Sequence, residues 1–320
     1  MIKALAITGP TASGKTSLSL SVAEMLGCEI ISCDSMQIYR GMDIGTAKAT
    51  AHEQARVPHH LIDILSPTEP YSAEQYRADA IECAREISSR GKIPLFVGGT
   101  GLYIDTVMRG GELSSPPSDY ALSEKLREIG STEEGRELLW QRLLEIDPQS
   151  AEKTHKNNVR RVVRAIEIFE LTGRTKSYYD LLSTEGEREI SVAMLTLDCH
   201  DREVLYQRVN ERVDAMMREG LLDEARRLFE SGLLDRKYTC SQAIGYKEML
   251  SFLLGEGTLI EAVEQLKQSS RRYAKRQLTW FRRERDAYRL HLDREDGTLL
   301  SGEELCKEAL EFFRAHLLQR

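Results

Sequence analysis

The residues with the clearest chemical meaning lie near the start of the chain, where positions 9–16 read Gly-Pro-Thr-Ala-Ser-Gly-Lys-Thr directly after a short apolar run. Glycines let the backbone wrap so that its N–H groups point at phosphate oxygens, and a helix beginning there adds the positive end of its dipole. Lys15 would then pair with phosphate charge, and the Thr16 hydroxyl would ligate Mg²⁺. The predicted phosphate-binding loop (P-loop) comprises Gly9, Thr11, Ala12, Ser13, Gly14, Lys15 and Thr16.

The P-loop by itself leaves the phosphate compound open. Kinases, NTPases and diphosphate-consuming transferases can all use such a loop, because it recognises phosphate and not the rest of the ligand. Taken alone, the loop suggests ATP binding.

A second candidate, Asp34, follows the apolar run at residues 28–32. Open α/β sheets bind ligands beyond the carboxyl ends of their strands, which is where Asp34 is expected. A carboxylate there can bind Mg²⁺, or accept a proton or hydrogen bond from an attacking nucleophile. An aspartate after a strand is also a common turn former, so both interpretations stay open on this residue alone.

The elements that must position these residues alternate between strand and helix patterns. Such alternation implies a parallel sheet with right-handed crossovers. The sequence therefore predicts an α/β fold with a P-loop NTPase-like, doubly wound parallel sheet. Strands are predicted at residues 5–8, 28–32, 61–65 and 93–97, and helices at residues 16–26 and 73–89.

The pattern changes in the middle of the chain. Residues 119–184 have helical periodicity without a convincing strand, and an apolar run at 192–197 then restores the strand signature. Helices dominate afterwards, with a long one expected at 259–285 and a late strand at 288–292. We therefore expect residues 1–112 and 190–320 to form the P-loop core with C-terminal helices, and residues 113–189 to form a mostly helical insertion domain.

Composition sets the broad class of the protein. The chain has 320 residues, is 41% hydrophobic and carries a formal net charge of −7, which is typical of a globular protein and excludes a surface that is basic all over. No apolar run approaches the length of a membrane span. Six scattered cysteines lack zinc-ligand spacing and are expected to be structural, reduced thiols. These features predict a cytoplasmic protein, with a monomer as the default state.

Further motifs surround Asp34. Residues 34–39 read DSMQIY, residues 40–48 read RGMDIGTAK, and residues 97–103 read VGGTGLY. Later come His-x-Asn at 155–157, Arg-Val-Val-Arg at 161–164, Arg-x-x-x-Arg at 208–212, Gly-Tyr at 245–246 and Ala-Lys-Arg-Gln-x-Thr-Trp at 274–280. This ordered series resembles the tRNA dimethylallyltransferase (isopentenyltransferase) family over nearly the whole chain, in its bacterial type without a zinc-finger tail. One departure is Asn158, where the family commonly has Asp.

The resemblance implies transfer of a dimethylallyl group from dimethylallyl diphosphate to N6 of adenine 37 of tRNA, next to the anticodon, with release of diphosphate. An exocyclic amine is a poor nucleophile and needs a positioned proton acceptor, the role that the family assigns to Asp34. The departing diphosphate needs a positive field, which the P-loop, Mg²⁺ on Thr16 and Arg212 would supply. The resemblance makes Thr100 a positioning group beside the reacting atoms, so the implied catalytic residues are Asp34, Thr100 and Arg212.

Contact with tRNA should appear as local basic stripes in this acidic chain. Residues 269–285 contain seven Lys/Arg and one acid with aromatic residues interleaved, and residues 156–176 contain six Lys/Arg. A single basic helix is usually a solvated face, but two beside this motif set favour an RNA backbone. The insertion domain would grip the anticodon arm, and the adenine would be extruded into the site. The implied tRNA-binding residues are Asp34, Ser35, Met36, Gln37, Tyr103, Asn158, Arg161, Arg164, Gly245, Tyr246, Lys275, Arg276 and Gln277.

Two other classes of protein compete with this interpretation. A P-loop kinase for a nucleotide or small molecule would turn over ATP and close a lid over its acceptor. An RNA-binding module that uses the P-loop as a nucleotide-dependent switch would hydrolyse NTP and form no covalent product.

Overall fold

The computed structural model describes residues 1–108, 116–182 and 187–318. The chain divides into two compact units, one formed by Met1–Met108 with Glu189–Arg320 and the other by Arg109–Arg188. The predicted domain boundary at residues 112–113 lies outside the described residues, as does the end of the predicted helical stretch at 184. The second unit is therefore an insertion in the sequence of the first, between Met108 and Glu189.

The first unit is built on a six-stranded sheet in which every pairing is parallel. The strand order is β3-β2-β4-β1-β5-β6. The register places Leu5 of β1 beside Leu95 of β4 and beside Ala193 of β5, so β1 lies between strands that come later in the chain. The strands are β1 (Ile2–Thr8), β2 (Cys28–Ser32), β3 (His59–His60), β4 (Ile93–Gly98), β5 (Ile190–Asp198) and β6 (Tyr288–His291).

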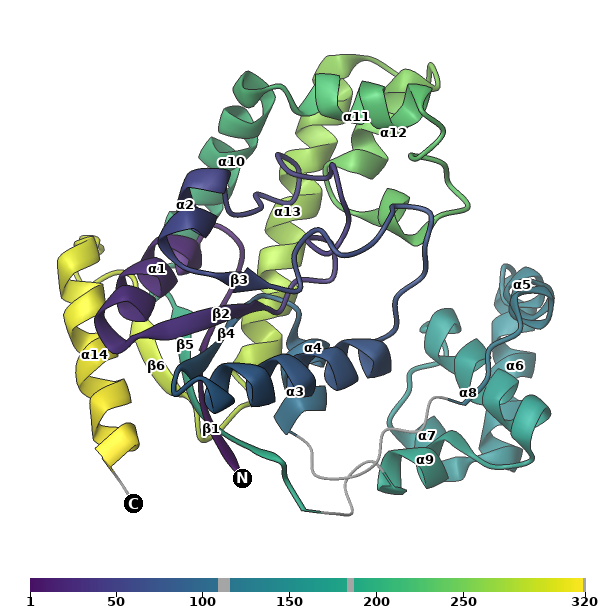
Figure 1. Cartoon of the computed structure of the whole chain (residues 1–320). Coiled ribbons are helices and arrows are strands. Elements are labelled where there is room, and N and C mark those ends of the chain that lie inside the picture. The colour runs from purple at the N-terminus through teal and green to yellow at the C-terminus, as the bar shows by residue number, and fades with distance from the viewer. Residues whose placement is uncertain (109–115, 183–186, 319–320) are drawn as a thin grey trace. The chain divides into compact units, whose positions relative to one another are not determined.

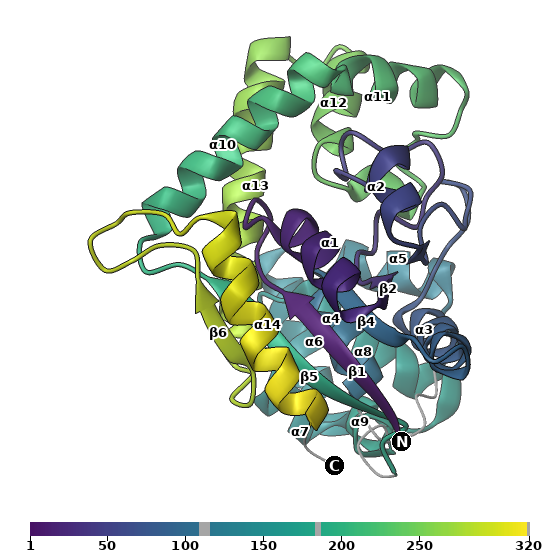
Figure 2. The same ribbon diagram turned by 60° about the vertical axis from the view of Figure 1, so that its left-hand side comes forward.

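Helices cover both faces of this sheet, because alternate side chains of each buried strand point to opposite sides. Leu5 and Ile7 pack with α1 (Lys15–Leu26) and α14 (Gly302–Leu318), whereas Ala4 and Ala6 pack with α3 (Ala73–Ser89) and α4 (Gly101–Met108). Figure 2 shows α14 and α1 together on one face. The predicted doubly wound parallel sheet is confirmed.

The predicted strand at residues 61–65 is wrong. Only His59 and His60 pair with β2, and the chain then leaves the sheet because Leu61 and Asp63 have left-handed φ angles of 59° and 55°. An extended strand cannot contain such residues. Leu65 returns to form a single bridge with Tyr39, in the loop that follows Asp34.

The remaining helices of the first unit follow β2 and β5. The predicted long helix ends four residues early, at Phe281; the next residue, Arg282, caps it and pairs through its guanidinium with Asp198. Helices α10 and α13 lie beside each other (Figure 1) and bury Val209 and Leu278 against Ala12 of the P-loop. These elements are α2 (Ala51–Arg56), α10 (Arg202–Glu219), α11 (Leu221–Glu230), a 3₁₀ turn (Thr239–Gln242), α12 (Tyr246–Leu253) and α13 (Leu259–Phe281).

The second unit is helical throughout its described residues, where no strand occurs. Its core joins Leu139 and Leu143 to Val162 and Ile166. None of the helices in the described parts of the chain has the length and apolarity of a bilayer-spanning segment. The helices are α5 (Tyr120–Ile129), α6 (Glu133–Ile146), α7 (Pro148–Glu152), α8 (Val159–Thr172) and α9 (Lys176–Leu182).

The core of the second unit can be tested with two leucines of α6. Leu143 is fully buried, whereas Leu138 is 64% exposed. We expect Leu143→Ala to lower the free energy of unfolding of this unit by about 2–5 kcal/mol, because it leaves a cavity. Leu138→Ala should change it by less than about 0.5 kcal/mol. Hydrogen exchange of the α6 and α8 amides measures both, and equal effects would contradict this core.

Candidate active site

Three loops of the first unit meet at the carboxyl edge of its sheet. The P-loop follows β1, the segment containing Asp34 follows β2, and Thr100 follows β4. Residues of the first two loops line one cavity of about 600 Å³, and Arg212 of α10 and Tyr273 of α13 line it as well. Parallel strands end at one edge, so their loops converge there although they are far apart in the sequence.

The P-loop has the backbone shape that the sequence predicts. Gly9 has a φ of 139°, and a Cβ there would lie 2.8 Å from the Leu197 carbonyl oxygen, so only glycine fits. Lys15 Nζ donates hydrogen bonds to the carbonyls of Gly9 (3.0 Å) and Pro10 (2.6 Å). Ser13 Oγ is buried without a hydrogen-bond partner among the described residues. The loop is therefore folded, with a hydroxyl left for a ligand.

Two cationic side chains are kept close together in this cavity. Burial, followed by the nearby Arg212, lowers the pKa of Lys15 to about 7, and Asp34 opposes this shift. Burial also lowers the pKa of Arg212, again against Asp34, and its Nε is buried without a hydrogen-bond partner among the described residues. A buried donor without an acceptor and two neighbouring cations both cost folding free energy unless an anion binds between them. The cavity is therefore electrostatically suited to a polyanion.

Arg208, one helical turn before Arg212, contacts the same loop. Its Nε donates to the Ala12 carbonyl at 2.9 Å. Arg208 therefore does not simply face solvent. It supports the P-loop from α10 through this hydrogen bond.

Asp34 is held in a turn by its neighbours. Its Oδ1 accepts a hydrogen bond from the Met36 amide at 2.9 Å. Thr100 fastens this turn to β4, since its amide donates to the Cys33 carbonyl (3.1 Å) and its Oγ1 accepts from the Ser35 amide (3.1 Å). The other carboxylate oxygen, Oδ2, has no contact of this kind within the turn, so Asp34 keeps an acceptor for a ligand.

Tyr273 is a residue that the sequence showed only as one aromatic within a basic stripe. It lines the cavity, and burial followed by the charge of Asp34 raises its pKa. Arg276, one turn later, places its guanidinium 5.5 Å from the Tyr273 ring centre. The spacing of the two residues on α13 was the available signal for this pair.

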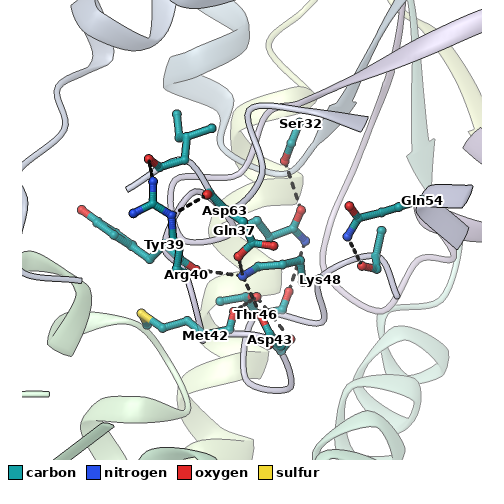
Figure 3. Close-up of polar contacts among 12 residues, drawn as sticks. Ser32, Gln37, Tyr39, Arg40, Met42, Asp43, Thr46, Lys48, Gln54 and Asp63 are labelled. Atoms are coloured by element: carbon teal, nitrogen blue, oxygen red, sulfur yellow. Dashed lines mark hydrogen bonds and ion pairs between the residues drawn. The ribbon is translucent and has the colours of Figure 1, made fainter. Parts of the chain in front are cut away.

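The loop that follows Asp34 is held by a buried lysine, as Figure 3 shows. Lys48 Nζ donates to the Tyr39 carbonyl (2.8 Å), Asp43 Oδ1 (2.6 Å) and Asp63 Oδ1 (2.5 Å). The Gln37 amide accepts from Ser32 Oγ and donates to two carbonyls of the same loop. Gln37 was predicted to contact tRNA; its amide is bonded inside the loop, and the residue lines the cavity together with Ser35 and Met36.

A buried glutamate, Glu224 of α11, holds the same loop from the other side. Its carboxylate accepts the backbone N–H groups of Asp43, Ile44 and Gly45, and the Tyr246 hydroxyl at 2.5 Å. Tyr246 is fully buried, so its predicted role as a direct tRNA contact is corrected to support of this loop. Sequence reasoning missed Glu224 because a helical glutamate gives no sign of burial.

Three other residues predicted to contact tRNA have side chains that bond or pack within the protein. Tyr103 is buried and stacks on Tyr76, with ring centres 3.8 Å apart. In the second unit, Arg164 donates to the carbonyls of Pro116 and Pro117 and pairs with Glu167. Gln277 is buried and bonds both the P-loop and Gly99.

Four of the remaining predicted contacts are accessible. Lys275 and Arg276 of α13 are exposed, as are Asn158 and Arg161 of the second unit. Asn158 also caps α8, since its side chain accepts from the Arg161 amide. Gly245, in contrast, is buried; it has a φ of 101° and precedes the first residue of α12.

Comparison with known proteins places the chain in a family. A family model described as IPP transferase matches residues 37–284, and one described as isopentenyl transferase matches residues 2–62. The chain belongs to the IPP transferase family. Its relatives include the tRNA dimethylallyltransferases of Bacillus velezensis, 50% identical over 86% of each chain, and of Geobacillus thermodenitrificans, 49% identical over 88% of this chain and 87% of that one.

Solved structures of the family share the fold. The tRNA isopentenylpyrophosphate transferase of Bacillus halodurans is 43% identical, with a TM-score of 0.72 over 99% of this chain and 97% of that one. A eukaryotic dimethylallyltransferase captured acting on tRNA is 29% identical, with a TM-score of 0.70 over 91% of this chain and 74% of that one. The family match therefore extends over both units of the chain.

The pKa of Lys15 can be tested by chemical modification. An amine with a pKa of about 7 is largely neutral at pH 8 and therefore nucleophilic, unlike an ordinary lysine with a pKa of about 10.4. We expect Lys15 to react with an amine reagent with a midpoint near pH 7. Pyrophosphate should raise that midpoint, because a bound anion favours the charged amine. Mass spectrometry follows the reaction, with exposed Lys92 as the reference, and a midpoint unmoved by pyrophosphate would contradict the assignment.

Proposed function

We propose that the chain transfers a dimethylallyl group from dimethylallyl diphosphate to N6 of adenine 37 of tRNA and releases diphosphate. The observation that supports this most is the pairing of two cations, Lys15 and Arg212, with one carboxylate, Asp34, in the same cavity. The cations suit the leaving group and the carboxylate suits the amine. Membership of the IPP transferase family supports the same reaction.

The donor half of the reaction needs stabilised negative charge. As the allylic C–O bond breaks, its electron pair passes to the diphosphate, which Lys15, Arg212 and the P-loop amides are placed to receive. Ser13 Oγ, buried and unpartnered among the described residues, can donate a further hydrogen bond. These groups lower the barrier only to the extent that they bind the departing diphosphate more tightly than the intact donor.

Mg²⁺ fits this half of the site. The described residues contain no cluster of three or more His, Cys, Asp or Glu side chains that could hold a metal ion. Mg²⁺ is commonly held by one or two protein groups together with substrate phosphates and waters. Thr16, whose side chain lines the cavity, would supply the protein ligand, and the ion would add positive charge at the diphosphate.

The acceptor half needs a proton acceptor. The adenine nitrogen forms its new bond to the allylic carbon and gives up one proton, which Asp34 accepts. Thr100 keeps Asp34 in place through Ser35, and Tyr273 adds an aromatic wall beside the carboxylate. An adenine reaches this depth only when it leaves the stacked anticodon loop.

Exposed cations on both units would bind the RNA backbone. On α13 and just beyond it, Arg271 bonds Asn210 and Arg282 pairs with Asp198, so these two are occupied. Contact with phosphates supplies affinity that falls with salt. The exposed cations are Arg272, Lys275, Arg276 and Arg283 in the first unit and Arg160 and Arg161 in the second, where the neutral amide of Asn158 is a further exposed candidate. A tRNA substrate also supports the cytoplasm as the location, and we retain a monomer as the proposed state.

One assay separates this function from a kinase and from a nucleotide-dependent switch. The protein is incubated with Mg²⁺, labelled dimethylallyl diphosphate and undermodified tRNA, and parallel samples receive labelled ATP. Transfer of prenyl label into RNA supports the proposal. Phosphorylation of an acceptor would support a kinase, and NTP hydrolysis without a covalent RNA product would support the switch. If tRNA binds under the assay conditions and no prenyl group is transferred to it, the proposal is wrong.

Asp34 can be tested by Asp34→Asn. The amide keeps an oxygen for the Met36 N–H, so the turn should survive, but it cannot accept the proton. We expect kcat to fall about 10²–10⁴-fold, with the Kd for tRNA changed only a few-fold. Single-turnover transfer and filter binding measure the two quantities. Near-normal transfer with weakened tRNA binding would show that Asp34 binds tRNA but does not accept the proton.

Lys275 can be tested by the salt dependence of tRNA binding. We expect Lys275→Ala to weaken binding similarly for all tRNA substrates and to make the slope of log K against log salt shallower by about one. Lys307→Ala, which removes an exposed lysine from α14, is the matched control and should leave the slope unchanged. Equal slopes for wild type and Lys275→Ala would remove Lys275 from the phosphate contacts.

A further inference from the structure

One buried side-chain amide joins the two halves of the site. Gln277 Oε1 accepts the backbone N–H of Thr11 in the P-loop at 2.8 Å. Its Nε2 donates to the carbonyl of Gly99, next to Thr100, at 2.9 Å. Gln277 is 5% exposed and forms part of the cavity wall; its bond to Gly99 is buried and its bond to Thr11 is partly buried.

The surroundings of this amide leave it little freedom. A Cβ at Gly99 would lie 2.1 Å from Nε2 of Gln277, so the glycine is needed for the approach. On the same side of α13, Trp280 packs against Gly101 and its Nε1 donates to Asp105 at 3.3 Å. Helix α13 is thus fastened to the turn after β4 through Gln277 and to α4 through Trp280.

We propose that Gln277 is a positioning residue that sets the separation between the diphosphate and the proton acceptor. The inference rests on the proposed function, and it replaces the predicted role of Gln277 as a tRNA contact. The loop on the donor side holds the diphosphate, and Thr11 is part of it. On the acceptor side, Gly99 adjoins Thr100, whose Oγ1 holds the Ser35 amide beside Asp34. One rigid amide therefore spans both sides.

The chemistry of the amide explains why glutamine is needed. Only a side chain with one acceptor and one donor at this spacing can satisfy both a backbone N–H and a backbone carbonyl. Leucine satisfies neither. Glutamate keeps an acceptor for Thr11 but presents a second acceptor to the Gly99 carbonyl, unless its carboxyl is protonated. A displacement of either loop by about 1 Å can lower the rate of a positioned reaction 10²-fold.

The test compares Gln277→Leu and Gln277→Glu with Gln268→Leu, the same change at an exposed position of α13. We expect both Gln277 variants to lower kcat about 10²-fold near pH 8, with the Kd for tRNA within about twofold of wild type. Gln268→Leu should keep the wild-type kcat. The kcat of Gln277→Glu divided by the wild-type kcat should rise as the pH falls from 8 to 6. Burial raises the pKa of a carboxyl, so the introduced glutamate becomes protonated in this range and again presents a donor to the Gly99 carbonyl. Taking the ratio cancels the titration of groups that both proteins share.

Hydrogen exchange gives a second measurement that needs no activity. The Thr11 amide should exchange faster in Gln277→Leu, which removes its acceptor, and at the wild-type rate in Gln277→Glu, which keeps one. A kcat for Gln277→Leu within threefold of wild type, a ratio that is constant with pH, or equal exchange in both variants would overturn the proposal. Failure of the proposed function looks different, since the wild-type protein itself would then transfer no prenyl group while the exchange pattern would remain.

Discussion

The site depends on keeping Lys15 and Arg212 close together and away from water. Burial lowers the pKa of both groups, and the charge of Arg212 lowers the pKa of Lys15 further. Asp34 offsets only part of these shifts. The surrounding loops and helices hold the two groups in place, and the cavity therefore favours an anion that brings several negative oxygens at once.

Buried polar groups behind the site hold these loops. Lys48 and Glu224 hold the loop after Asp34 from two sides, and Gln277 ties the P-loop to the turn before Thr100. Each of these side chains satisfies several backbone groups that would otherwise be unpaired in the interior. Loops with no regular secondary structure are thereby tied to the elements around them, and a reaction between two positioned substrates requires such fixed geometry.

The sequence predicted the parts of the fold that local pattern controls. Strand β2 and helix α3 have the predicted bounds, because apolar runs and caps are local signals. The strand expected at residues 61–65 failed because Asp63 adopts a left-handed conformation in a turn whose carboxylate and carbonyl bond Lys48 and Arg40, distant in sequence. No period or propensity in that segment reveals such partners.

The candidate site was predictable in a similar, partial way. Motif spacing identified Lys15, Asp34 and Thr100, since each stands just beyond a strand of one parallel sheet. It did not separate residues that face a ligand from residues that support the site. Tyr246 and Gln277 lie in motifs as distinctive as that of Asp34, yet both are buried with their polar atoms bonded to protein. Burial is a tertiary property, so a sequence motif marks a constrained position without saying which constraint applies.

Helix α13 shows how one element meets several of these constraints. Lys275 is exposed to solvent, Tyr273 and Arg276 line the cavity, and Gln277 is buried against the P-loop and Gly99. At 3.6 residues per turn, neighbouring positions point in different directions, so RNA-facing, cavity-facing and supporting roles can occupy adjacent residues. The basic stripe and the glutamine within it are therefore not competing interpretations. They are different faces of one helix, and a tRNA bound to the outer face, as proposed, would lie against the helix that carries Gln277.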